Sequence, residues 1–129
     1  MTDTWEPIKR DSVEVTGVDT EHAGLLHIVV QLSAVPPQEW PHRFENPIGL
    51  ESSISMHPPR VNGARITLLV QDDRVREYIE NVDARIAAAN LYYESEVLPA
   101  KAARAKAKAD ERDEVTRRVT EAQRIVDSL

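Results

Sequence analysis

Apolar residues recur at helical spacing through the middle of the chain. The repeat runs at steps of four, three, four, three and four residues: Val75, Ile79, Val82, Ile86, Ala89 and Tyr93. Such steps keep one side of a helix apolar over several turns. An apolar, strand-like run at 64–70 precedes the repeat, and Asp72 or Asp73 is suited to cap the N-terminus of a helix. We therefore predict a strand that leads directly into a long helix, from residue 73 to about 97.

Two further strands are expected nearer the N-terminus. Residues 12–16 alternate between polar and apolar side chains, and residues 25–33 form the strongest strand pattern in the chain. A four-residue loop at 19–22 would join them as a hairpin. Their apolar faces then agree if the facing pairs are as follows: Val18 with Ala23, Val15 with Leu26, and Val13 with Ile28.

The segment at 36–47 contains four prolines, which exclude a central strand. Proline is tolerated in the first turn of a helix, so one or two helical turns are expected near Pro37 or Pro41. Trp40 and Phe44 would then project from the same side, four residues apart. We predict that these rings close the end of the core rather than bind a ligand.

A third strand is expected at 50–57, and Asn62-Gly63 marks the turn to the strand at 64–70. A two-residue turn would mix the two faces of these strands. A three-residue loop with Gly63 in the left-handed conformation instead pairs apolar residues, namely Met56 with Leu68 and Ile54 with Val70. Pro58 and Pro59 mark the third strand as an edge of the sheet.

The chain after Pro99 is rich in alanine and contains neither glycine nor a further proline, so it favours a helix. Pro99 either kinks one long helix or begins a second one. Steps of four, three, four and three form a narrow apolar seam of the coiled-coil kind: Val115, Val119, Ala122, Val126 and Leu129. We predict an α+β domain at 1–98, with a four-stranded antiparallel sheet of two hairpins covered on one face by the long helix, and a charged helical extension at 99–129.

Charge and composition narrow the classes of function. The net charge is −6, and residues 71–129 hold eleven basic and thirteen acidic side chains, which is typical of solvent-facing helices. Four cations at Lys101, Arg104, Lys106 and Lys108 are followed by acidic residues, so a nucleic-acid partner is disfavoured. There is no cysteine, no apolar run of membrane-spanning length and no leader pattern. We expect a cytoplasmic protein, and the frequent alanine and arginine suggest a bacterial one.

Motifs of nucleotide, hydrolase and metalloprotease sites do not occur in the sequence, so we predict no catalytic residue, cofactor or metal. The polar face of the predicted sheet is one candidate ligand surface, because His27, His57 and Arg65 could offer hydrogen bonds or contact an anion. An antiparallel sheet can equally present that face to water.

Two hypotheses follow. The first is a non-enzymatic interaction or assembly module that self-associates through its C-terminal helices, along the seam from Val115 to Leu129. The alternative is a small-molecule-binding domain or enzyme that uses the sheet face around His27, His57 and Arg65.

Overall fold

The computed structural model describes residues 5–21, 24–47 and 58–129 of the chain. Its elements follow in this order: β1 (Arg10–Asp19), β2 (Leu25–Leu32), α1 (Trp40–Glu45), β3 (Arg60–Asn62), β4 (Arg65–Val70), a 3-10 turn (Asp72–Arg74), α2 (Val75–Tyr92), a π-helical segment (Tyr93–Val97) and α3 (Leu98–Asp127). The chain divides into two compact units, one up to Tyr93 and the other Glu94–Leu129. This division lies five residues before the predicted boundary at 98/99.

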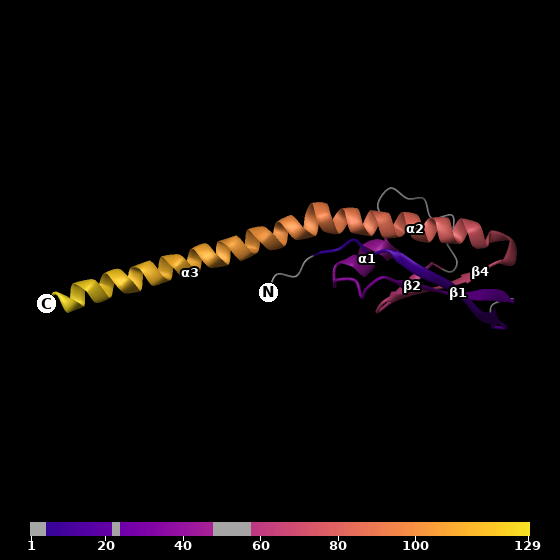
Figure 1. Ribbon diagram of the computed structural model, residues 1–129, viewed down its shortest axis with the longest axis horizontal. Coiled ribbons are helices and arrows are strands. Elements are labelled where there is room, and N and C mark those ends of the chain that lie inside the picture. Colours follow the sequence, from indigo (N-terminus) through magenta and orange to yellow (C-terminus); the bar gives the residue numbers. More distant parts are fainter. Residues whose placement is uncertain (1–4, 22–23, 48–57) are drawn as a thin grey trace. The chain divides into compact units, whose positions relative to one another are not determined.

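The four strands form one antiparallel sheet in the order β1-β2-β4-β3, and α2 runs along one face of it (Figure 1). The predicted fold class is thereby confirmed. The predicted strand at 50–57, with Ile54 and Met56, lies outside the described residues. β3 instead follows directly after the buried Pro59 and is an edge strand, as the adjacent prolines indicated.

The register of the first hairpin differs from the prediction. Val15 faces Ile28 and Val13 faces Val30, two residues further along β2 than expected. The turn is longer because Gly24, at φ 74°, takes the left-handed conformation and its N–H bonds to the carbonyl of Asp19. A bulge between Val15 and Gly17 then changes the facing by one residue. The valines therefore remain on the apolar face despite the shift.

The second hairpin also has a different turn from the predicted three-residue loop. Asn62 faces Arg65 and Val61 faces Ile66, which leaves Gly63 and Ala64 as a two-residue connection. Gly63 does adopt the expected positive φ, at 60°, but it occupies the first central position of a tight turn. The predicted register depends on pairing residues of the 50–57 segment, whereas the observed ladder pairs 60–62.

The core lies between α2 and the two central strands. Ile28, Val30 and Leu32 of β2 and Ile66, Leu68 and Val70 of β4 are all buried. From α2 they meet a stripe of buried side chains: Tyr78, Val82, Arg85, Ile86 and Ala89. Val75 and Ile79, which the repeat also places inward, are only partly buried. Apolar periodicity thus located the buried side of the helix but missed Tyr78 and the charged Arg85.

The start of α2 differs from the predicted aspartate cap. Asp72 and Asp73 form a 3-10 turn, and the α-helix begins at Val75. Within the described chain neither N-cap residue, Gln71 or Arg74, makes a side-chain capping bond. Arg74 binds Glu77 in the first turn at 2.9 Å, and the acidic side chains still lie at the positive end of the helix.

The π-helical segment Tyr93–Val97 follows α2, and Pro99 stands in the first turn of α3. The backbone at Val97, directly before α3, has right-handed helical angles, so α2, the π-helical segment and α3 follow one another without a non-helical residue. Both possibilities that the sequence left for Pro99, a kink in one long helix or the start of a second, are compatible with this arrangement.

Helix α1 confirms the prediction for the proline-rich segment. Trp40 and Phe44 are fully buried, and their rings stack with centroids 5.4 Å apart. Two side chains of α2 hold the ends of this short helix: Asn90 accepts a hydrogen bond from Trp40 Nε1 at 2.8 Å, and Arg85 donates to the carbonyls of Phe44 and Glu45 at 3.1 Å. A helix of six residues is too short to be stable alone, so these contacts stabilise it.

Candidate functional site

The outward face of the sheet holds two of the three candidate ligand residues. His27 is partly buried and its Nε2 lies 3.9 Å from the Asp19 carboxylate, at the limit of an ion pair. Arg65 is exposed at the start of β4. His57 lies outside the described residues.

The strand register separates His27 from Arg65. His27 faces Leu69, whereas Arg65 faces Gln31, four residues further along β2. At about 3.3 Å per residue this places the two side chains roughly 13 Å apart along the strand. The face between them carries Val29 and Thr67, both partly buried. A small ligand that contacts one of these two side chains would therefore not reach the other.

Helix α3 presents the second candidate surface, the seam of Val115, Val119, Ala122, Val126 and Leu129. Every residue from 102 to 129 is exposed, and the fractions for Val115, Val119 and Val126 are 54%, 63% and 59%. Ile125 adds a further apolar side chain beside the seam, 56% exposed. A thirty-residue helix that exposes this row to water has an apolar surface suited to a partner.

The polar side chains of α3 bond to their own helix. Glu114 pairs with Arg117 at 2.7 Å, Glu121 pairs with Arg124 at 3.4 Å, and Gln123 donates to Asp127 at 2.8 Å. The bond to Glu114 raises the pKa of Arg117 above its ordinary value. Such contacts three or four residues apart support an isolated helix and are typical of a water-facing surface.

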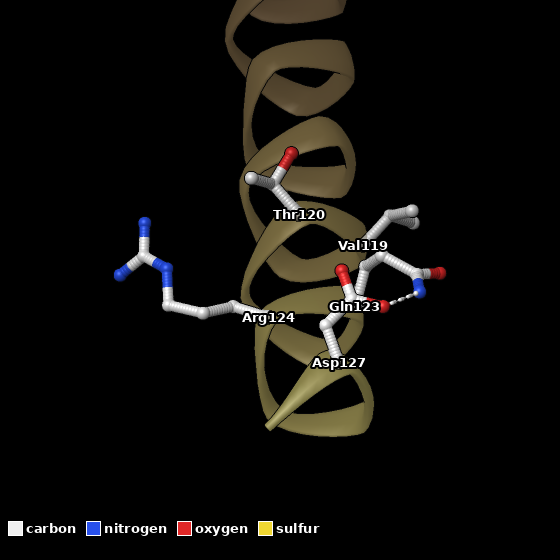
Figure 2. Close-up of a pocket in the computed structure, with 5 residues that line it drawn as sticks. All are labelled: Val119, Thr120, Gln123, Arg124 and Asp127. Carbon is white, nitrogen blue, oxygen red and sulfur yellow. Dashed lines mark hydrogen bonds between the residues drawn. The ribbon is translucent and has the colours of Figure 1, made fainter. Parts of the chain in front are cut away.

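One shallow hollow lies on the seam, and a second lies beside it and shares Val119. One is lined by Val115, Arg118, Val119 and Ala122, and the other by Val119, Thr120, Gln123, Arg124 and Asp127. Figure 2 shows Val119 and Gln123 on one side of α3 and the Arg124 side chain extending from the other. These are grooves between successive turns of one helix, of the kind that receives side chains of a facing helix.

Sequence reasoning missed two polar residues that organise the first unit. Asn90 accepts from the Ile8 N–H at 3.1 Å and donates to the Ile8 carbonyl at 2.9 Å, in addition to its bond with Trp40. One side chain thus ties the N-terminal segment and α1 to α2. Its position next to Ala89 on the inward stripe was the available signal, since a polar residue there needs partners.

Arg85 is the second missed residue, and it is only 2% exposed. Its Nε donates to Asn81 at 2.7 Å, and its Nη1 reaches the two carbonyls at the end of α1. Burial lowers the pKa of Arg85 below its ordinary value, and the carboxylate of Glu45 acts in the opposite direction. These bonds satisfy helix carbonyls, so we assign Arg85 a structural role.

An apolar strip along β1 was also not anticipated. Val13, Val15 and Val18 face the same side of the sheet as the core, yet they are 36%, 54% and 59% exposed. The buried apolar residues of the sheet belong to β2 and β4. The cover provided by α2 therefore does not extend fully over β1. The prediction that the helix covers the apolar face holds for the central strands.

Candidate metal sites and membrane-spanning helices were sought in the described ranges 5–21, 24–47 and 58–129. This part of the chain contains no group of three or more His, Cys, Asp or Glu residues able to hold a metal ion. In the same part, no helix combines the length and the apolar character needed to cross a bilayer.

Comparison with known proteins finds no matching family model, no similar curated protein and no similar solved structure.

Proposed function

We propose that the protein is a non-enzymatic assembly module that associates with a second copy of itself through the α3 seam. The observation that carries this proposal is the exposed row from Val115 to Leu129 on a helix whose residues are exposed from 102 onward. Burying such side chains against a partner removes apolar surface from water at roughly 25 cal/mol per Å². A facing helix with the same seam offers matching knobs and holes.

The composition of α3 supports a helical partner rather than a small ligand. Its hollows are open grooves, and several of its polar side chains, such as Glu114, Arg117 and Gln123, bond within the helix. The seam spans about two heptads, so the association is expected to be weak. A Kd near 1 mM corresponds to ~4 kcal/mol, and the seam should supply at least this.

Sedimentation equilibrium of the full chain over a wide concentration range tests the proposal. We expect a reversible monomer–dimer equilibrium that the double variant Val119→Asp/Val126→Asp abolishes, because each dimer would bury unpaired carboxylates. Thr120→Asp is the matched control: it adds a charge of the same sign beside the seam and should leave most of the association intact.

A chain that stays monomeric at about 1 mM contradicts the proposal, since an association of ~4 kcal/mol would already be visible there. A dimer that survives the double variant would also contradict it, because the contact would then lie elsewhere. Far-UV circular dichroism of each variant must show unchanged helix content for the comparison to hold.

A further inference from the structure

We propose, resting on self-association through α3, that the two copies pair in antiparallel orientation over residues 112–129. The seam alone fits either orientation. The charged residues that continue its spacing toward the N-terminus distinguish the two, because each orientation places different side chains opposite one another.

The seam has a defined heptad frame. Val119 and Val126 occupy the a positions, and Val115, Ala122 and Leu129 occupy the d positions. The same frame, continued toward the start of α3, places cations at the core positions: Arg112 at a, and Lys108 and Lys101 at d. The seam is therefore apolar from residue 115 onward and carries positive charges before it.

A parallel, in-register pair places each core residue against its own copy. Arg112 would face the Arg112 of the second copy, and Lys108 and Lys101 would face theirs in the same way. Like charges at facing positions oppose pairing. The small Ala122 would also face Ala122 of the second copy, so this layer of the core would be packed less densely than the valine and leucine layers on either side.

An antiparallel pair places a positions against d positions and removes these conflicts. Val119 then faces Ala122 of the second copy, so the small side chain packs against a larger one, and Val115 faces its Val126. Arg112 faces Leu129, where its methylene groups can cover the leucine while the guanidinium stays in water. That end of the second helix carries Asp127, a favourable charge for an arginine.

The basic run also separates in the antiparallel pair. With Val119 opposite Ala122 of the second copy, Lys108 lies beyond the paired region of the other helix. At 1.5 Å per residue, the two Lys108 positions are then about 38 Å apart along the axis. This separation is several Debye lengths at physiological ionic strength, so their repulsion is screened.

The flanking positions do not favour the parallel alternative. Thr116 and Gln123 occupy the e positions, and Arg118 and Ile125 occupy g positions of the paired region. Opposite charges at e and g, which fix orientation and partner in many coiled coils, are not paired here. The core cations, rather than the e and g positions, therefore set the direction of the pair.

Disulfide trapping tests the orientation, because the chain contains no cysteine of its own. The variants Arg112→Cys and Leu129→Cys are oxidised separately and as an equimolar mixture in a thiol–disulfide buffer. We expect mixed dimers between the two variants to exceed either homodimer by at least about tenfold, since disulfide formation needs Cα atoms within ~7 Å. In the antiparallel pair, the two copies of position 129 would lie about 26 Å apart along the axis.

Efficient homodimers of Leu129→Cys with few mixed dimers would overturn the antiparallel orientation in favour of a parallel pair, in which positions 112 and 129 lie about 26 Å apart along the axis. Arg124→Cys is the control, because Arg124 projects from the side away from Val119 and should not be trapped in either orientation (Figure 2). Absence of trapping in every variant also overturns the inference. Sedimentation of the unsubstituted chain then shows whether self-association itself fails or only this pairing.

Salt dependence gives an independent readout. An antiparallel pair should keep its Kd within about threefold between roughly 50 and 500 mM salt, because its core cations do not face one another. A parallel pair should tighten markedly over this range as salt screens its facing cations. Strong tightening would therefore contradict the antiparallel pair.

Discussion

Helices α2 and α3 are adjacent in sequence, but different forces hold them. The α2 side chains reach residues far away along the chain: Asn90 bonds to Ile8, 82 positions earlier, and Arg85 bonds to Phe44, 41 positions earlier. The side-chain hydrogen bonds found within α3 join residues three or four apart. Burial thus fixes α2, whereas α3 depends on local propensity and short-range pairs. Helix content alone therefore does not show that a segment belongs to a folded core.

The substitution expected to change the stability most, and so the strongest test of this contrast between α2 and α3, is at Asn90. Asn90→Leu removes the partners of the Ile8 N–H and carbonyl and of Trp40 Nε1. We expect a loss of about 3 kcal/mol in the free energy of unfolding, since each unsatisfied buried group costs about 1–3 kcal/mol. Urea denaturation followed by tryptophan fluorescence measures it.

Gln123→Leu is the matched change in α3, because Gln123 bonds only to the nearby Asp127 in the described structure. It should leave the urea midpoint of the first unit unchanged. Equal losses for the two variants would show that Asn90 is no more important than a surface amide.

A pair of identical substitutions gives the next largest effect. Val82 is fully buried and Val119 is 63% exposed. Val82→Ala should lower the free energy of unfolding by about 2 kcal/mol, from lost transfer energy and the cavity that remains. Val119→Ala should change it by less than about 0.5 kcal/mol in the monomer, because alanine is also the better helix former. A similar cost at both sites would mean that α3 is buried in the monomer.

The smallest expected change in stability comes from removing an ion pair. A small change would show that ion pairs are not what distinguishes α2 from α3. Arg10 binds Asp83 at 2.8 Å between β1 and α2, with both side chains well exposed. This contact raises the pKa of Arg10. Asp83→Asn should cost less than about 1 kcal/mol in the free energy of unfolding, measured by urea denaturation, as exposed pairs usually do.

Glu114→Gln is the counterpart in α3, and it should lower helix content only slightly, measured by circular dichroism at low salt. A large loss at Asp83 and none at Glu114 would indicate that long-range ion pairs, rather than burial, distinguish the two helices.

Much of the fold could be predicted from the sequence because its apolar patterns are regular. The alternation in β2 and the repeat in α2 indicated the sheet, its apolar face and the covering helix. Four prolines, together with Trp40 and Phe44, indicated a short helix that closes the core. These features depend on side-chain spacing, which a sequence displays directly.

The details that failed depend on backbone conformation and on contacts between distant residues. The register of the first hairpin depends on the positive φ of Gly24 and on a bulge at Thr16. Neither feature changes the pattern of polar and apolar residues along the sequence. Arg85 and Asn90 look like surface residues until their distant partners are known. The seam from Val115 to Leu129 was evident from spacing, and its self-association stays a prediction.

The Asn90 contact also sets an order of events during synthesis. Ile8 leaves the ribosome early, but its hydrogen-bonding partner follows 82 residues later. Closing so long a loop before α2 has formed costs entropy without any compensating bond. The contact between Ile8 and α2 therefore forms only after residue 90 has been made, whereas the neighbouring Lys9 already finds its partner in Ser33, at the end of β2.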